Sequence, residues 1–293
     1  MNIAFIGYGT FGQALASLVQ HNGLDYDYAE PAHLLSKHAD LVFLTLPSQH
    51  IRTALEANSP FVDQDSVIIN AAKGIEEGTH QMVHQIVASV GEFPYYYSLI
   101  GPSFADGIRT HDPAVVSLGY KDPTFLADIQ KALQTPYFRV EPAKGFQALE
   151  LASALKNLYA ITCGYARGLG FGPNTQAQLI SIGLREFTIL AKAMRFADHD
   201  PIAPGVAGDL FLTCSSDHSR NFQYGLRLAK GVRSGQRQLE KHTVEGYYTS
   251  HSINHIAKKH KAVLPLAALT SQIVNHQSHG ATEFRNFLAS YRV

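Results

Sequence analysis

The chain has 293 residues, and its 24 lysine and arginine residues are balanced by 24 aspartate and glutamate residues. This balance excludes a global electric field that would attract nucleic acid or an anionic membrane, so an anionic ligand would need a local cluster of positive charge. The chain is longer than one ordinary compact core, and 45% of its residues are hydrophobic, so we expect two folded domains rather than disorder.

The cysteines and the apolar runs indicate the compartment. Cys163 and Cys214 make neither a Cys-x-x-Cys pair nor a disulfide framework, which favours a reducing compartment, and we expect the cytoplasm. The chain opens on the apolar run 3–6 without the basic and apolar regions of a signal peptide. Since no run approaches about 18 apolar residues, we expect no membrane span.

Short apolar runs alternate with helical stretches in the first half of the chain. Buried strands are predicted where such runs are bounded by turn residues, at 3–6, 40–46, 66–70, 97–100 and 114–118. A helix is predicted over 11–19, and another just before Asp40. Strands that alternate with helices predict an α/β domain with a doubly wound parallel sheet.

The pattern changes after a further extended run at 137–140. Residues 145–196 have helical periodicity, interrupted by the glycine- and proline-containing segment 168–173. We therefore predict an α/β domain over residues 1–141 and a mostly α-helical domain over residues 142–293.

A glycine motif, Gly7-Tyr8-Gly9-Thr10-Phe11-Gly12, lies between the first predicted strand and the first predicted helix. Gly7 permits a tight turn, Gly9 lets a pyrophosphate approach the backbone, and Gly12 lets the helix pack close to the strand. The N–H groups at the helix N-terminus favour the phosphates. A glycine-rich turn of another function is the alternative, but the flanking strand and helix favour a dinucleotide-binding Rossmann domain.

Two further loops follow predicted strands, where an open α/β sheet binds its ligands. Lys73, in the segment 70–76, can bring an ammonium group to an anion, and Gly101 and Ser103 can offer an approachable backbone and a hydroxyl group. Taken alone, a solvated loop lysine and a plain turn would explain these residues equally well.

Lys156 and Asn157 interrupt an otherwise apolar helical stretch over 152–160. A buried lysine is rare unless it is paired or functional, and burial disfavours its charged form, which suits proton transfer. The alternative is a lysine that reaches solvent from the edge of the apolar stripe. Asp209 is the expected carboxylate partner.

The sequence Ser219-Arg220-Asn221 precedes a helical stretch that runs to Lys230. Ser219 is expected to cap this helix, which places Arg220 and Asn221 in its first turn. A guanidinium group, an amide and a helix N-terminus together favour phosphate binding. Alone, an ordinary capped helix with an exposed arginine would be the simpler interpretation.

Taken in order, these motifs resemble those of the bacterial-type NAD(P)-dependent glycerol-3-phosphate dehydrogenase family. The matching segments are 7–12, 73–76, 101–105, 154–157, 208–214, 219–221 and 244–246, so the resemblance covers nearly the whole chain. It implies a Rossmann domain followed by a helical domain like the C-terminal domain of 6-phosphogluconate dehydrogenase. It also implies reversible reduction of dihydroxyacetone phosphate to sn-glycerol 3-phosphate, which feeds glycerophospholipid synthesis, with NAD as cofactor and NADP possible.

The resemblance also implies roles for individual residues. Lys156 would be the catalytic lysine, with Asp209 and Lys73 acting beside it. The substrate would contact Lys73, Gly101, Ser103, Lys156, Asp209, Ser219, Arg220 and Asn221. The cofactor would contact the glycine motif with Gly7, Gly9, Thr10, Phe11 and Gly12, and also Lys73, Ala105, Arg220 and Glu245. A homodimer is expected, and no metal site, because the 15 histidines are scattered.

The segment after the glycine motif departs from the family. The family carries a basic residue, a helix and another strand there, whereas this chain leads from Glu30 almost directly to Asp40. Asp25, Asp27 and Glu30 lie where a carboxylate usually binds the cofactor's ribose, and no lysine or arginine occurs between Gly12 and Lys37. We therefore expect NADH to be preferred over NADPH, with Glu30 or Asp27 as the ribose partner. A smaller departure is Thr10-Phe11, where the family usually has Ser-Trp.

Two alternatives stay open. A β-hydroxyacid or ketopantoate-type reductase would share the architecture and could hold a carboxylate through Arg220. A non-catalytic dinucleotide-binding regulator would account for the shortened first half, although Lys156, Asp209 and Lys73 argue against it.

Overall fold

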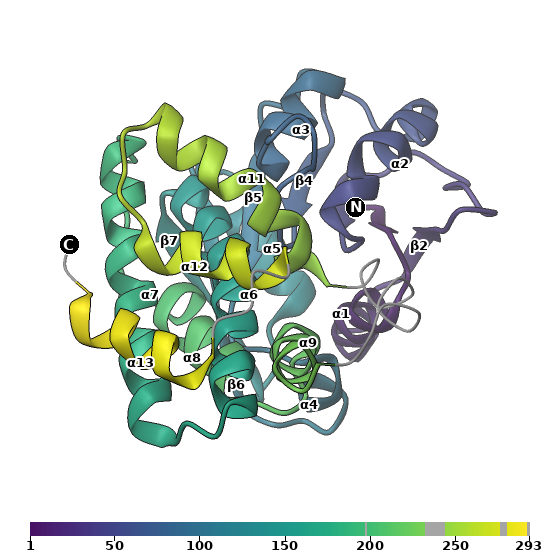
Figure 1. The fold of residues 1–293 in the computed structure, drawn as a ribbon. Helices are drawn as coiled ribbons and strands as arrows, with labels where there is room; N and C mark the ends of the chain where they lie inside the picture. Colours follow the sequence, from purple (N-terminus) through teal and green to yellow (C-terminus); the bar gives the residue numbers. More distant parts are fainter. Residues whose placement is uncertain (197, 232–243, 276–279, 292–293) are drawn as a thin grey trace. The chain divides into compact units, whose positions relative to one another are not determined.

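The computed structural model describes residues 1–196, 198–231, 244–275 and 280–291 (Figure 1). The chain divides into two compact units, which we call the sheet unit and the helical unit. The sheet unit comprises Met1–Lys73, Gln81–Glu150 and Ala203–Gly205. The helical unit comprises Gly74–His80, Leu151–Ile202 and Val206–Val293.

Among the described residues, the sheet unit contains a seven-stranded sheet with the order β2-β1-β3-β4-β5-β6-β7. The strands are β1 (Ile3–Ile6), β2 (Tyr26–Ala29), β3 (Leu41–Leu44), β4 (Val67–Asn70), β5 (Tyr96–Ile100), β6 (Ala114–Tyr120) and β7 (Phe138–Lys144). Strands β1 to β5 run parallel to one another, and Phe5 of β1 lies between Tyr28 of β2 and Phe43 of β3. The doubly wound α/β fold predicted from the sequence is confirmed.

The far edge of the sheet is the one departure from an all-parallel arrangement. Strand β6 runs antiparallel to β5, with Ile100 opposite Ser117, and β7 runs parallel to β6. The connection from β5 to β6 contains the short helix α4 (Ala105–Arg109), which packs against α1 (Thr10–His21). The sheet is therefore mostly parallel.

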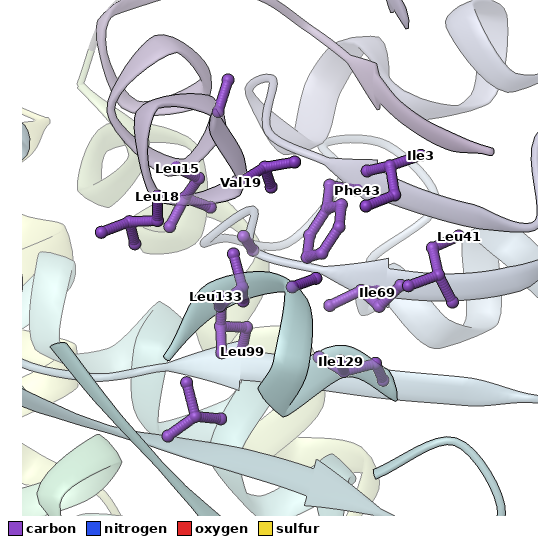
Figure 2. Packing of buried hydrophobic residues seen from close by; sticks show 14 of the residues in the cluster. Ile3, Leu15, Leu18, Val19, Leu41, Phe43, Ile69, Leu99, Ile129 and Leu133 are labelled. Atoms are coloured by element: carbon purple, nitrogen blue, oxygen red, sulfur yellow. The ribbon is translucent and has the colours of Figure 1, made fainter. Parts of the chain in front are cut away.

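Side chains on alternate strand positions fill two separate cores, one on each face of the sheet. Ile3 and Phe5 face the core beneath α1 and α5 (Leu126–Leu133), whereas Ala4 and Ile6 face the core beneath α2 (Ile51–Ala57) and α3 (Val83–Val90). The short helices η1 and η2 span Ser48–His50 and Ser59–Phe61. Figure 2 shows the first core, in which Val19 of α1 points toward Phe43 of the sheet, and Leu15 and Leu18 belong to the same core. Burial on both faces explains why β1 and β3 are continuous apolar runs.

The segment between β2 and β3 contains no helix, so the helix predicted before Asp40 was wrong. The backbone N–H of Ser36 donates to the Asp27 carboxylate at 2.7 Å, and the N–H of Leu35 donates to Asn58 Oδ1 at 3.0 Å. Because side chains from outside the segment take these donors, they are not available for helical hydrogen bonds.

The helical unit is built around α6 (Phe146–Gly168). Residues 148–166 of this helix are all buried, as expected for a helix surrounded by others. The other helices are α7 (Pro173–Ala193), η3 (Pro204–Gly208), α8 (Asp209–Ser215), α9 (Arg220–Ala229), α11 (Glu245–Lys259), α12 (Pro265–Val274) and α13 (Ala281–Ser290). The domain boundary expected between residues 141 and 142 lies inside β7, whereas the compact units divide on the chain between Glu150 and Leu151. In the part of the chain that the structure describes, no helix is long and apolar enough to cross a membrane.

Two glycines let α9 pack directly on α6. A Cβ atom at Gly164 would lie 2.7 Å from the carbonyl carbon of Phe222, and one at Gly225 would lie 2.7 Å from the carbonyl carbon of Ile161. Any side chain at either position would push the two backbones apart. This close approach sets where α9 begins relative to α6.

Glu186 of α7 is a fully buried carboxylate that binds the start of α12. It accepts hydrogen bonds from the backbone N–H groups of Leu266 at 2.6 Å and Ala267 at 3.0 Å, and from the Tyr159 hydroxyl at 2.9 Å. Burial raises the pKa of Glu186 to about 7, because these hydrogen bonds only partly offset the loss of water.

This raised pKa predicts a pH-dependent stability. Between the ordinary value of 4.5 and about 7, the folded protein binds a proton at Glu186 that the unfolded chain releases. The free energy of unfolding should therefore fall as the pH rises through this window, by about 3 kcal/mol from this group. The Glu186→Gln variant should lack this part of the pH dependence when denaturant unfolding is measured from pH 5 to pH 8.

Glu283 provides a matched control. Its exposed carboxylate accepts a backbone hydrogen bond from Gly280 at the start of α13, at 2.7 Å. Glu283→Gln should leave the pH dependence unchanged. A wild-type slope retained in Glu186→Gln would contradict the assignment.

Candidate functional site

The glycine loop connects β1 to α1, and its glycines differ in how closely other residues approach them. Gly7 has φ of +96°, and a Cβ atom there would lie 2.7 Å from Leu46 Cβ. A Cβ atom at Gly12 would lie 2.8 Å from the Thr45 hydroxyl oxygen, and this hydroxyl donates to the Gly7 carbonyl. In contrast, no described residue would lie within 4 Å of a Cβ atom at Gly9, and none caps the N-terminus of α1 with its side chain. The loop thus offers backbone N–H groups to an anion.

Lys73 lies beside this loop. It follows β4 as the last residue of the first segment of the sheet unit, and its Nζ atom lies 4.8 Å from the centre of the Phe11 ring. An ammonium group over an aromatic face is attracted by the ring quadrupole. The contact brings Lys73 and Phe11, from distant parts of the sequence, to one place.

The loop after β5 lies in the same unit and is tied to the same helix. A Cβ atom at Gly101 would lie 2.6 Å from the backbone of β6, so only glycine fits. Ser103 is buried, and its N–H donates to the Gly101 carbonyl at 2.8 Å. Ala105 begins α4, whose Arg109 donates to the Thr10 carbonyl at 3.0 Å. The loop and the start of α1 are therefore held together.

Lys156 and Asp209 form a buried ion pair in the helical unit. Lys156 Nζ donates to Asp209 Oδ1, and the two side chains are 5% and 2% exposed. Lys156 comes from the middle of α6, and Asp209 is the first residue of α8. Among the described residues, Asp209 Oδ2 has no hydrogen-bond partner, although it is buried. An unpaired buried acceptor costs about 1–3 kcal/mol, so we expect this atom to accept from a group outside the described residues, such as water or a ligand.

Asn157, the residue after Lys156, connects α6 to the starts of α9 and α11. Asn221 Nδ2 donates to Asn157 Oδ1 at 2.9 Å, and the Gly246 N–H donates to Asn221 Oδ1 at 2.9 Å. A Cβ atom at Gly246 would lie 2.7 Å from the carbonyl carbon of Asn157, so the start of α11 rests directly on α6. Glu245 is the first residue of α11. These contacts fix the starts of α9 and α11 against the helix that carries Lys156.

Ser219 caps α9, as the sequence predicts. Its hydroxyl oxygen accepts from the backbone N–H of Phe222 at 3.3 Å. Arg220 is the first helical residue and is exposed, with Asn221 behind it in the same turn. The guanidinium group and the N–H groups of this turn therefore occupy one end of the helix.

The two candidate ribose partners differ in what they already bind. The carboxylate of Asp27 accepts from the N–H of Tyr28 at 2.8 Å and from both the N–H and the hydroxyl of Ser36 at 2.7 Å and 2.8 Å. Partial burial opposes ionisation, but these hydrogen bonds lower the pKa of Asp27. Glu30 is exposed just after β2, where its backbone pairs with His33. Asp27 thus has a structural role in the shortened segment, which leaves Glu30 as the better candidate.

Sequence analysis missed the buried carboxylate of Glu150. It accepts hydrogen bonds from Asn70 Nδ2 at 3.1 Å, Ser98 Oγ at 3.0 Å, His84 Nδ1 at 2.8 Å and the Tyr96 hydroxyl. Burial opposes its ionisation, but the neighbouring His84 and the hydrogen bonds lower its pKa. The available signal was a glutamate between two leucines in an apolar stretch of the sequence.

The structure places the expected site residues in two groups. The sheet unit contains the glycine motif with Thr10 and Phe11, and Glu30, Lys73, Gly101, Ser103 and Ala105. The helical unit contains Lys156, Asp209, Ser219, Arg220, Asn221 and Glu245. In the residues that the structure describes, no group of three or more His, Cys, Asp or Glu side chains is arranged to hold a metal ion.

Comparison with known proteins gives consistent matches over both units. Residues 29–126 match the family model for the N-terminus of NAD-dependent glycerol-3-phosphate dehydrogenase, and residues 146–283 match the model for its C-terminus. The chain is 34% identical to the glycerol-3-phosphate dehydrogenase [NAD(P)+] of Solidesulfovibrio magneticus, over 91% of each protein. It is 35% identical to that of Lawsonia intracellularis, over 81% of this chain and 67% of the relative.

A solved structure agrees with these matches. The crystal structure of glycerol-3-phosphate dehydrogenase from Coxiella burnetii superposes with a TM-score of 0.87 at 25% identity, and the match covers 98% of both chains. On the combined evidence of sequence and fold, the chain belongs to the NAD(P)-dependent glycerol-3-phosphate dehydrogenase family.

Proposed function

We propose that this chain catalyses the reversible reduction of dihydroxyacetone phosphate to sn-glycerol 3-phosphate. The observation that carries the proposal is the buried Lys156–Asp209 pair, in which Asp209 Oδ2 has no partner among the described residues. Buried polar atoms are normally hydrogen-bonded, so in a purely structural ion pair we would expect both carboxylate oxygens to have a partner. Membership of the family supports the phosphorylated triose as substrate and a nicotinamide dinucleotide as cofactor.

The glycine loop suits this cofactor. The open tip at Gly9 and the uncapped start of α1 fit a pyrophosphate, with Thr10, Phe11 and Ala105 beside it and Lys73 supplying positive charge. Glu30 would bind the ribose, and the family resemblance implies that Arg220 and Glu245 also contact the cofactor. When bound, the cofactor supplies the hydride that reduces C2 of the triose.

Lys156 would transfer the proton that accompanies reduction. Its Nζ atom donates a proton to the C2 oxygen of dihydroxyacetone phosphate as the carbonyl becomes an alcohol, and accepts a proton from the alcohol in the reverse direction. Asp209 Oδ1 holds the ammonium group in place. Asp209 Oδ2 would accept a hydrogen bond from the free hydroxyl group of the triose, which would orient the substrate.

The substrate phosphate would bind at the start of α9. Arg220 offers a planar guanidinium group beside the N–H groups of the first turn. Asn221 would help by position, because its amide already bonds to Asn157 and Gly246. The family resemblance also implies Lys73, Gly101 and Ser103 as substrate-binding residues.

Two other functions make different predictions in one assay. NADH oxidation, followed by absorbance, would be measured with dihydroxyacetone phosphate and with a panel of 2-keto acids. We expect dihydroxyacetone phosphate to have the highest kcat/KM. A 2-keto acid that is reduced faster would favour a ketopantoate-type reductase, and cofactor binding without turnover would favour a regulator.

The setting of the enzyme is also a proposal. The two free cysteines favour the cytoplasm, where the product would enter glycerophospholipid synthesis. A homodimer is proposed from the architecture, and light scattering on the purified protein would measure its mass in solution.

Replacing Lys156 should abolish most of the turnover. Lys156→Ala should lower kcat by about 10²–10⁴ if the residue transfers a proton, while Arg220 still binds the phosphate. The variant also leaves Asp209 buried without its partner, so thermal unfolding must be measured beside the kinetics. Lys156→Gln, which can still donate to Asp209, should fold well and remain slow. Near-normal kcat in Lys156→Gln would remove Lys156 from the chemistry, and the exposed Lys131→Ala serves as the control.

Replacing Arg220 should weaken binding of the phosphate specifically. Arg220→Ala should reduce the binding of dihydroxyacetone phosphate by roughly 2–4 kcal/mol, as for a lost charge-assisted contact. Binding of unphosphorylated dihydroxyacetone should change far less. Arg227→Ala, near the other end of α9, is the control for a lost positive charge on this helix. Equal losses with both substrates would place the phosphate elsewhere.

The cofactor side should favour NADH over NADPH. A 2′-phosphate near Glu30 would be repelled, and Arg52 is already bonded to Ser89 Oγ and Gln81 Oε1 at 2.5 Å and 2.8 Å. Steady-state kinetics at matched concentrations should give the higher kcat/KM for NADH. Glu30→Gln should reduce the ratio of kcat/KM for NADH to kcat/KM for NADPH, whereas Asp25→Asn should leave this ratio unchanged. A higher kcat/KM of the wild type for NADPH would refute the prediction.

A further inference from the structure

A buried carboxylate lies behind the loop that carries Lys73. Glu150, in the first turns of α6, is 3% exposed and belongs to the sheet unit. Its Oε1 atom accepts from Asn70, Ser98 and Tyr96, and its Oε2 atom accepts from the backbone N–H and Nδ1 of His84.

The amide group of Asn70 can adopt only one orientation in this setting. Asn70 is the last residue of β4, and its Nδ2 atom donates to Glu150 at 3.1 Å. On its other side, Asn70 Oδ1 accepts from the backbone N–H of Ala72 at 2.8 Å. Because a carboxylate only accepts and a backbone N–H only donates, the amide cannot be turned over without losing both bonds.

This orientation fixes the backbone directly before Lys73. The bond from Ala72 to the Asn70 side chain closes a tight turn at the end of the strand, and the Ala71 N–H donates to the Leu44 carbonyl at 2.9 Å. The turn leads to Lys73, whose ammonium group lies 4.8 Å from the centre of the Phe11 ring in the glycine loop. A continuous set of contacts therefore runs from Glu150 through Asn70 to Lys73.

We propose that Glu150 is a positioning residue that, by orienting the Asn70 amide, holds the turn that presents Lys73 to the ligands. The inference rests on the proposed function, since it takes Lys73 as a ligand-binding residue. Glu150 does not touch the ligands in this account, and it acts through an accepting oxygen rather than through its charge. Long-range hydrogen bonding of this kind sets a lysine's position more closely than a loop on its own can.

Four variants distinguish an effect on the turn before Lys73 from a general loss of stability. Glu150→Leu removes the accepting oxygen, whereas Glu150→Gln keeps one at the Oε1 position and should rescue the defect. Asn70→Ala removes the connecting amide and leaves Glu150 with its other donors. If Glu150→Leu does not fold, Asn70→Ala alone tests whether this amide holds the turn before Lys73. Ser98→Ala is the matched control, because it removes a donor to the same oxygen without touching Asn70.

The first measurement is amide hydrogen exchange at Ala72. Its N–H should lose protection in Glu150→Leu and in Asn70→Ala, and should keep it in Glu150→Gln and Ser98→Ala. Retained protection in the first two variants would overturn the inference whatever the enzyme's substrate proves to be.

The second measurement is coupling to Lys73. Glu150→Leu and Asn70→Ala should each raise the Kd for NADH and the KM for dihydroxyacetone phosphate by about tenfold, the order expected within one network, with a smaller effect on kcat. In a Lys73→Ala background these increases should disappear. Equal increases with and without Lys73 would show a general structural effect and overturn the inference. If Lys73→Ala alone changes neither constant, the proposed role of Lys73 fails and the inference fails with it, whereas loss of activity toward this triose alone would fault only the proposed function.

Discussion

The ion pair between Lys156 and Asp209 is the constraint on which the helical unit's site depends. Both groups are almost completely buried, so neither is tolerated without the other, and breaking such a pair costs about 3–5 kcal/mol. The pair joins the middle of α6 to the first residue of α8, and the glycine contacts of α9 and the Asn157–Asn221–Gly246 bonds bring two more helix starts to α6. One oxygen of Asp209 is left for a donor that the described side chains do not supply.

In the sheet unit, the candidate binding surface is formed by backbone groups rather than by a buried ion pair. Among the described residues, Gly7 and Gly12 have close neighbours and Gly9 has none, so the loop is confined where it meets the sheet and accessible where an anion would lie. Lys73 brings positive charge to the same loop from β4. Its position depends on Asn70, whose amide satisfies an acceptor on one side and a donor on the other. The buried Glu150 carboxylate thus influences the candidate binding surface without being part of it.

Local patterns predicted much of this, and long-range contacts explain what they missed. The continuous apolar strands, the helical second half and the Ser219 cap depend on neighbouring residues, and all are present. The Lys156–Asp209 contact could be anticipated because a buried lysine needs a carboxylate. The helix expected before Asp40 fails because Asp27 and Asn58 bind its backbone from outside the segment. The reversal of β6 and the partners of Glu150 depend on strand order, which an apolar run does not encode.

The central claim is that Asp209 Oδ2 is kept for the free hydroxyl group of the substrate. Acetol phosphate, which differs from dihydroxyacetone phosphate only in lacking that hydroxyl, tests it most directly. The wild-type enzyme should reduce acetol phosphate with a kcat/KM lower by about 100-fold, the order expected when one buried acceptor is left unpaired. Equal kcat/KM values for the two phosphates would contradict the assignment of Asp209.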